Sequence, residues 1–451
     1  MPTSLITIAR TGAAAARADL ELTAQNIANA SNPDYSRRRL GQAEHVGTAN
    51  VQFQARSTLN GVLVEGTERI GNDFAQRQVR ASMSDLARAE SELGALRGVE
   101  TALEQTRIYE GLVGFEAALT LLESDPTDPA LRTGALETAR QLAQSFQSAD
   151  FALANTRDLA AAQLATGADT INGLASELAR VNVELVSAHE GTAGRAALLD
   201  ARDAALRDLA DQVGIDVTLD AFGSAEVRIL SNPAPAGEAG VLLVSGSGFS
   251  MLTANESGGA VTLNANGVDF VANSGQMAGI ANALADISVR QADLDDIAAQ
   301  TIARANAAQA VGSALDGSGG QPLFSGSDAG SIRMVLADGS GLALAPAGSP
   351  AGSRDTANLG NLIAALGADD GPIVSTDRTL LSLSSKIAGL ATTSDGLAII
   401  KQSAESALFA ETGVDLDTEA ASLVRLQQAF EANSRVIQVA TELFDTILGL
   451  R

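Results

Sequence analysis

The chain has 451 residues, about three domains' worth, and its 30 basic and 54 acidic side chains give a formal net charge of −24. Such an acidic chain repels phosphate backbones, and the absence of cysteine excludes disulfides, thiolate metal sites and cysteine nucleophiles. With two histidines and no apolar run approaching 18 residues, we expect no nucleic-acid partner, metal, other cofactor or membrane insertion.

The N-terminal segment has the pattern of a long amphipathic helix. Apolar and small residues recur at three- and four-residue steps from Leu5 through Leu20 to Ile27, which predicts a helix over residues 4–30. Pro33 ends it, because proline lacks an N–H and disfavours the helical conformation of the residue before it. No basic start precedes an apolar stretch here, so we expect no cleaved secretory signal.

The middle of the chain alternates between helical and β-like segments. Short apolar runs at 51–53 and 61–64 predict a β-hairpin near residues 50–70. Helical periodicity then predicts helices over about 73–108, over 131–186 with a break near Asn155, around 199–213, over 277–310, and after Leu359. Residues 214–274 alternate apolar and polar side chains and predict a small β-rich domain. Residues 312–352 are rich in Gly and Ser, with strand candidates at 332–336 and 342–344.

The C-terminal segment carries a heptad-like seam. Its members are Leu423, Leu426, Phe430, Ile437, Ala440, Phe444 and Ile447, and only Asn433 interrupts the series. Asp415 or Asp417 can cap the start of this helix. Two apolar terminal helices need a partner surface: each other, another copy of the chain, or both. We expect an assembly interface on this seam together with Leu5, Leu20 and Ile27; Asn433 either sets the register of the seam or lies at its wet edge.

These elements predict a mainly α fold with β-rich insertions. The predicted divisions are 1–35 with 416–451 for the terminal domain; 36–213, 276–312 and 355–415 for the middle domain; 214–275 for the β-rich domain; and 313–354 for a Gly/Ser-rich β or loop segment.

No short motif has the spacing of a catalytic or metal site. The acid pairs at 295–296 and 369–370 are typical of a solvated surface. The loop at Asp316 lacks the ligand spacing of a calcium site, and His189-Glu190 is not followed by the second histidine of a zinc-protease motif. We expect the three arginines at 37–39 to meet acidic neighbours or solvent. The sequence therefore indicates no enzyme.

Several stretches resemble one known group of proteins, the flagellar rod, hook and hook-associated axial family. The N-terminal signature is similar at Asn26, Ile27, Ala28 and Asn29, followed by Pro33 and Tyr35; Asn32 and Asp34 replace the Thr and Gly that usually flank this proline. Residues 413–420, 426–430 and 435–438 resemble that family's terminal helix. The segment 198–203, with Leu199, Asp200, Arg202 and Asp203, is similar to an internal motif of the hook-associated branch, as are residues 315–317 and 320–324.

This resemblance implies a structural role at the junction between the flagellar hook and filament. It implies an elongated multidomain rod, with the N- and C-terminal helices paired as an inner coiled coil, a discontinuous helical middle domain and a small β-rich outer domain. It also implies type III export and an extracellular location in the bacterial flagellum. The implied partners are further copies of the chain in a helical or ring polymer, the hook protein, a second hook-associated junction protein and an export chaperone.

Two alternatives remain open at this point. A rod or hook subunit would share the same chain ends, but the 198–203 motif and the helix-rich middle argue against it. A secreted adhesin or enzyme could use the β-rich insertion, and a cleft with converging polar groups within residues 214–274 would favour that reading.

Overall fold

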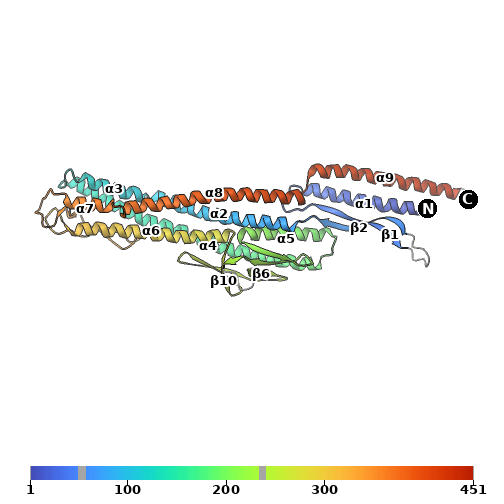
Figure 1. Cartoon of the computed structure of the whole chain (residues 1–451), viewed down its shortest axis with the longest axis horizontal. Helices are drawn as coiled ribbons and strands as arrows, with labels where there is room; N and C mark the ends of the chain where they lie inside the picture. Colours follow the sequence, from blue (N-terminus) through green and yellow to red (C-terminus); the bar gives the residue numbers. More distant parts are fainter. Residues whose placement is uncertain (1, 49–56, 233–239, 450–451) are drawn as a thin grey trace.

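The computed structural model describes residues 2–48, 57–232 and 240–449 and is an elongated, mainly helical rod (Figure 1). Long helices lie side by side along its axis, and small antiparallel sheets lie against them. The helices are α1 (Pro2–Asn29), α2 (Asp73–Thr106), α3 (Ile108–Leu121), α4 (Pro129–Ser187), α5 (Ala193–Gln212), α6 (Gln276–Ala310), the 3-10 turn η1 (Gly339–Gly341), α7 (Ala357–Leu366), α8 (Pro372–Thr412) and α9 (Leu416–Gly449). This confirms the predicted fold class.

The strands form several small antiparallel sheets. Strands β1 (Arg38–Thr48) and β2 (Ser57–Arg69) form one hairpin, and two four-stranded sheets have the orders β3-β4-β6-β7 and β5-β10-β9-β8. The strands of these two sheets are β3 (Ile215–Leu219), β4 (Ala225–Ile229), β5 (Ser231–Asn232), β6 (Val241–Ser245), β7 (Gly248–Phe249), β8 (Leu252–Ser257), β9 (Ala260–Ala265) and β10 (Val268–Ala272). Two short pairs join β11 (Gly312–Ser313) to β14 (Ala345–Pro346) and β12 (Phe324–Ser325) to β13 (Arg333–Met334). The predicted β-rich character of residues 214–274 is therefore correct.

The core of the rod is built mainly from aliphatic side chains. Leu96, Leu142 and Ile171 are fully buried between the long helices, as expected for a chain with few aromatic residues. Among the buried aromatic rings, those of Phe115 and Phe324 meet edge to face, with centroids 6.1 Å apart, toward the end remote from the chain termini. This geometry suits the quadrupoles of the two rings and ties α3 to β12.

Helix α4 is continuous, so the predicted break near Asn155 is wrong. The helix begins at Asp128, whose Oδ1 accepts hydrogen bonds from the N–H groups of Ala130 and Leu131, and it runs for 59 residues. Asn155 lies on the exposed face, while Leu153 and Ala160 on either side are buried. Because packing of the buried face outweighs the modest helix propensity of one asparagine, the helix passes through this position.

Other predicted boundaries also change. The predicted helix to residue 108 ends at Thr106, because Arg107 has a left-handed backbone with φ of +50° and starts α3. The hairpin begins at Arg38 rather than near residue 50; residues 61–64 do lie in β2, whereas 51–53 lie outside the described residues. Residues 342–344 are not a strand: they follow the 3-10 turn η1, and the buried Arg132 guanidinium binds the carbonyls of Gly339 and Leu342 there.

The two terminal helices are paired, as predicted. α1 and α9 lie alongside each other and run in opposite directions, so both chain ends lie at the same end of the molecule (Figure 1). α8 lies along α2 and leads into α9. Asp415 caps α9, since its Oδ1 accepts a 2.7 Å hydrogen bond from the Thr418 N–H.

Candidate assembly interface

Helix α1 is held between α9 and the β1–β2 hairpin. On the hairpin side, Thr11 Oγ1 accepts a 3.2 Å hydrogen bond from the Val62 N–H. Gly61 has φ of +103°, and a Cβ there would lie 2.0 Å from Thr11 Oγ1, so only glycine allows this approach. On the α9 side, a Cβ on Gly12 would lie 2.9 Å from Asn433 Oδ1. Asn433 therefore faces α1 within the seam and is seated over a glycine.

The seam residues are only partly covered by this pairing. Leu20 and Ile27 of α1 and Leu423, Leu426 and Ile437 of α9 are half-buried, and Ala440 is buried. Leu5, Phe430 and Phe444 remain exposed, and the side chain of Ile447 lies outside the described residues. A single chain thus covers one side of the seam and leaves its margins open to solvent.

A second apolar row on α9 has no cover in the described structure. Val436, Val439 and Leu443 follow at three- and four-residue steps and are 44%, 55% and 51% exposed. We call these three residues the outer row of α9. This row was not predicted from the sequence, because the longer apolar seam on the neighbouring face of α9 accounts for most of the helical periodicity there. Exposed apolar side chains arranged at coiled-coil spacing are typical of a helix that packs on a further helix.

The residues of the N-terminal motif meet where the terminal pair joins the rod. Asn26 Oδ1 accepts hydrogen bonds from the Tyr35 hydroxyl, at 2.8 Å, and from the Arg38 N–H, at 3.1 Å. Its Nδ2 donates to the Arg38 carbonyl at 2.9 Å and lies 3.4 Å from Glu419 Oε2. One buried amide therefore links α1, the turn after it, β1 and the first turn of α9. Loss of this amide would remove the partner that it provides to both the N–H and the carbonyl of Arg38.

The acidic residues of the 198–203 motif complete this connection from the rod side. Asp200 accepts from Arg38 at 2.9 Å and from Arg69 at 2.6 Å. Asp203 accepts from Arg69 at 2.6 Å, from Arg202 at 2.6 and 2.8 Å, and from Gln76 at 2.7 Å. Burial would raise the pKa of the Asp203 carboxyl, but Arg202 and Arg69 beside it hold that pKa below its ordinary value. The carboxylate is thus ionised and fully partnered.

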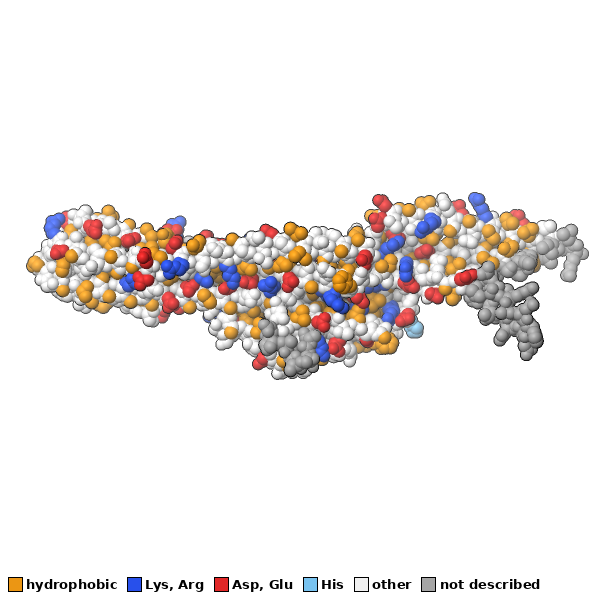
Figure 2. Space-filling view, in the orientation of Figure 1, with side chains coloured by type: hydrophobic (Ala, Val, Ile, Leu, Met, Phe, Trp, Pro, Cys, Tyr) orange, Lys and Arg blue, Asp and Glu red, His pale blue; other side chains and the backbone are white. Residues whose placement is uncertain are grey.

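We call this cluster the joint: Asn26, Tyr35, Arg37, Arg38, Arg69, Gln76, Asp200, Arg202, Asp203 and Glu419. Each of the three consecutive arginines pairs with an acid, as predicted: Arg37 with Glu419 at 2.6 Å, Arg38 with Asp200, and Arg39 with Glu68 at 2.8 Å. Basic side chains gather in the same region in Figure 2. The joint connects segments that are more than a hundred residues apart in the sequence, so it fixes how the terminal pair sits on the rod.

The remaining motif residues lie at the edge of the joint. Ile27 and Leu199 are half-buried, Ala28 and Pro33 are exposed, and Asn29 Nδ2 donates to the Gln25 carbonyl. Asp34, in the turn where the family pattern has glycine, pairs with Arg207 of α5. The substitution therefore adds a contact between the turn and the rod. Glu419, Arg69 and Gln76 were not predicted as members, because nothing in their local pattern indicates a partner so far along the chain.

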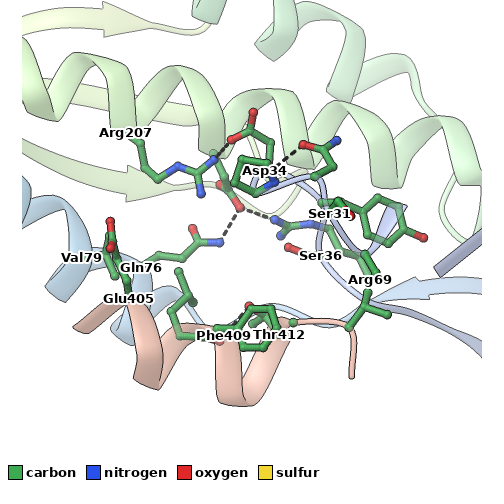
Figure 3. Close-up of a pocket in the computed structure, with 18 of the residues that line it drawn as sticks. Ser31, Asp34, Ser36, Arg69, Gln76, Val79, Arg207, Glu405, Phe409 and Thr412 are labelled. Carbon is green, nitrogen blue, oxygen red and sulfur yellow. Dashed lines mark hydrogen bonds and ion pairs between the residues drawn. The ribbon is translucent and has the colours of Figure 1, made fainter. Parts of the chain in front are cut away.

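A pocket of about 500 Å³ lies beside the joint, between the turn after α1 and the last turns of α8 (Figure 3). Its walls include the apolar side chains of Val79 and Phe409, and the ion pair of Asp34 with Arg207 spans one side. Arg69 and Gln76 also line the pocket, and both donate hydrogen bonds to Asp203. The charged side chains named here are paired with one another, so none of them is free to bind a ligand in the pocket.

The β-rich segment does not have the character of a catalytic cleft. Its hollow against α4 has a volume of about 580 Å³, but its polar groups bind the fold itself. Asn182 donates to the carbonyls of Ala225 and Gly246, and Asp220 accepts from backbone N–H groups of the following turn. Within the described residues, no group of acidic or histidine side chains could hold a metal ion, and no helix is long and apolar enough to cross a membrane.

Comparison with known proteins decides the family. The family model described as the flagellar hook-associated protein FlgK helical domain matches residues 96–324, slightly more than half of the chain. The chain belongs to the FlgK family. A second model, the C-terminal region of flagellar basal body rod FlgEFG proteins, matches residues 409–450, which include α9. FlgK proteins are structural components of the flagellum and not enzymes, which agrees with the prediction from the sequence.

Individual relatives are similar over about half of the chain. Flagellar hook-associated protein 1 of Escherichia coli strain K12 is 26% identical over 263 residues, which is 56% of this chain and 45% of that protein. The protein of the same name from Bacillus subtilis strain 168 is 26% identical over 222 residues, or 48% of this chain and 44% of the relative. The matched part thus spans less than half the length of each relative. A solved structure of the hook junction protein FlgK from Burkholderia pseudomallei aligns at 21% identity with a TM-score of 0.48, covering 55% of this chain and 46% of that one.

Proposed function

We propose that this chain is a structural subunit of the hook–filament junction that polymerises through its terminal helices. The observation that carries the proposal is the outer row of α9, which stays exposed although α9 already has α1 as a partner. Burying a Val or Leu side chain contributes roughly 1.5–3 kcal/mol, so three of them in each copy favour packing against a neighbouring helix. Membership of the FlgK family supports a place in the flagellum, and we propose that this place is extracellular.

The proposed partners follow from that setting. They are further copies of the chain in a ring or helical polymer, the hook protein on one side, a second hook-associated protein on the other, and a type III export chaperone before assembly. We assign the assembly interface to the outer row together with the exposed margins of the seam, Leu5, Phe430 and Phe444.

The proposed division of labour follows the predicted domains. Residues 1–35 and 416–451 assemble, the helical middle domain spaces and contacts neighbouring copies, and residues 214–275 face outward. The joint transmits the orientation of the terminal pair to the rod, because its buried ion pairs allow few alternative arrangements.

A deletion strain tests this role. Cells that lack the chain are expected to build hooks, to carry no attached filaments and to release flagellin monomers into the medium. Electron microscopy of the cells and measurement of secreted flagellin give the result, and restoring the gene is the control. Attached filaments on the deletion strain would contradict the proposal, and loss of the hooks themselves would indicate a rod or hook subunit instead.

A further inference from the structure

A cavity of about 440 Å³ opens where the first turns of α2 face α5 and β3. Arg77 and Arg80 line it from α2, Arg202 lines it from α5, and Thr218 contributes from β3. The joint uses Arg202, but it makes no hydrogen bond or ion pair with Arg77 or Arg80. The cavity therefore contains two cationic side chains, Arg77 and Arg80, that have no structural role in the joint.

Arg80 is the unusual member. It is 8% exposed, yet among residues 2–48, 57–232 and 240–449 no group accepts a hydrogen bond from its guanidinium and no carboxylate forms an ion pair with it. Removal from water lowers its pKa; the nearby Asp203 and Asp73 raise it, and Arg202 and Arg77 lower it, and the arginine stays charged. Its guanidinium nitrogens are not among the sealed polar atoms of the described structure but open onto the cavity, where they are free to bind an anion.

In the described part of the chain, the carboxylates around the cavity do not pair with the Arg80 guanidinium. Both oxygens of Asp203 are occupied, Oδ1 by Arg202 and Oδ2 by Arg69 and Gln76. Asp73 and Asp216 line the cavity, but in the described part of the chain neither forms an ion pair with an arginine. Arg80 is therefore not part of the hydrogen-bond network of the joint.

Other buried arginines show how the fold normally treats this side chain. Arg202 is 3% exposed and binds Asp203 through two nitrogens, and it also donates to the Gly223 carbonyl. Arg132 is equally buried and donates to three carbonyl oxygens, at 2.5, 2.9 and 3.0 Å. Arg80 faces the cavity and, unlike Arg202 and Arg132, leaves its guanidinium available to bind a ligand.

We propose that this cavity binds an oxyanion, a carboxylate or a phosphate group, with Arg80 as the principal ligand. A planar guanidinium matches two oxygens of such a group at once. Arg77 is exposed at the mouth and has no ion pair within the described residues, so it can close over the bound anion. The anion is either free phosphate from the surroundings or a carboxylate of a neighbouring copy, since each copy carries a net charge of −24.

Thermal unfolding of the full chain in inorganic phosphate tests the site, with chloride at equal ionic strength as the reference. At ten times the dissociation constant we expect phosphate to raise the melting temperature by about 2 °C. Arg80→Gln should remove this rise, and it should leave the melting temperature in chloride unchanged or higher, because Arg80 makes no internal ion pair. Arg140→Gln is the matched control, since Arg140 is an exposed arginine paired with Glu137, and it should keep the full rise. The proposal is overturned if phosphate shifts Arg80→Gln as much as the wild type, or shifts neither.

The number of attached filaments on cells that carry Arg80→Gln distinguishes the two sources of the anion, a neighbouring copy and free phosphate. If a neighbouring copy supplies the carboxylate, these cells should carry several-fold fewer attached filaments than wild-type cells, whereas Arg140→Gln cells should be normal. If free phosphate is the ligand, filament numbers should be normal while the variant still loses the phosphate-dependent rise. Both results support an oxyanion site at Arg80, and the thermal measurement alone decides whether the site exists.

Discussion

Phe430→Asp is expected to abolish attachment of filaments while leaving the rod folded. Phe430 lies on the seam of α9 and is 39% exposed, so its ring is partly packed in the single chain and its open side is available to a neighbour. Completing its burial contributes part of the roughly 1.5–3 kcal/mol that a large apolar side chain provides. An aspartate there loses this contribution and must also remain solvated or become protonated, which opposes close packing of the helices. Cells should then build hooks, lack attached filaments and shed flagellin.

The neighbouring residue supplies the control. Glu431 is exposed on the adjacent face of α9, and Glu431→Gln should assemble normally. The melting temperature of the rod should hardly change in either variant, because the buried core extends from Leu93 to Ile387 and includes no residue of α9. Normal filaments on Phe430→Asp cells, or unfolding of the rod in this variant, would show that the seam is not the assembly element.

Asp203→Asn is expected to lower the free energy of unfolding by roughly 3–5 kcal/mol at neutral pH. This carboxylate is the shared acceptor of two arginines and one amide, and its side chain is 6% exposed. Removing its charge leaves Arg202 and Arg69 without their common partner, which is the costly way to break a buried ion pair. Urea unfolding of the full chain measures the change. Asp158→Asn, at an exposed pair with Arg157, is the control and should change stability by less than about 0.5 kcal/mol.

The same variant should show a defined pH dependence. The pKa of Asp203 in the folded chain is lower than in the unfolded chain, where it is close to the ordinary aspartate value of about 3.9. The group therefore stabilises the fold fully above pH of about 4, and this contribution is lost as pH falls through the folded pKa. The difference between wild type and Asp203→Asn should be constant above that value and should shrink below it. A difference that grows on acidification would contradict the assignment.

Much of the fold was predictable because it depends on local periodicity. The seam of α9 and the three- and four-residue steps of α1 identify both terminal helices and their need for a partner surface. That the two helices pair with each other is what the resemblance to the axial family implied. The same reasoning located α2, α6 and the β-rich segment. The hairpin was misplaced because the less exposed positions of β1 beside Gln42 and Glu44 carry the small residues Gly41 and Ala43, so no large apolar side chains mark the strand in the sequence.

The joint was only half predictable. The resemblance to the axial family singled out Asn26, Asp200 and Asp203, and the run of arginines indicated acidic partners, but neither pairs one residue with another. The pairing of Arg37 with Glu419 spans 382 residues, and no local pattern specifies so distant a contact. Arg80 was not predicted for the opposite reason: its importance lies in having no partner, which only the packed structure reveals.

The central claim is that the outer row of α9 is covered by another subunit in the flagellum, and thiol labelling tests it most directly. The chain has no cysteine, so Val439→Cys introduces a single reactive group at a position that is 55% exposed. We expect a maleimide reagent to label this thiol rapidly in the isolated chain and at least ten times more slowly in intact hook–filament junctions. Glu190→Cys, at an exposed turn after α4, provides the control for access of the reagent. If the thiol at position 439 reacts equally fast in both states, the outer row is not an assembly surface and the account is wrong.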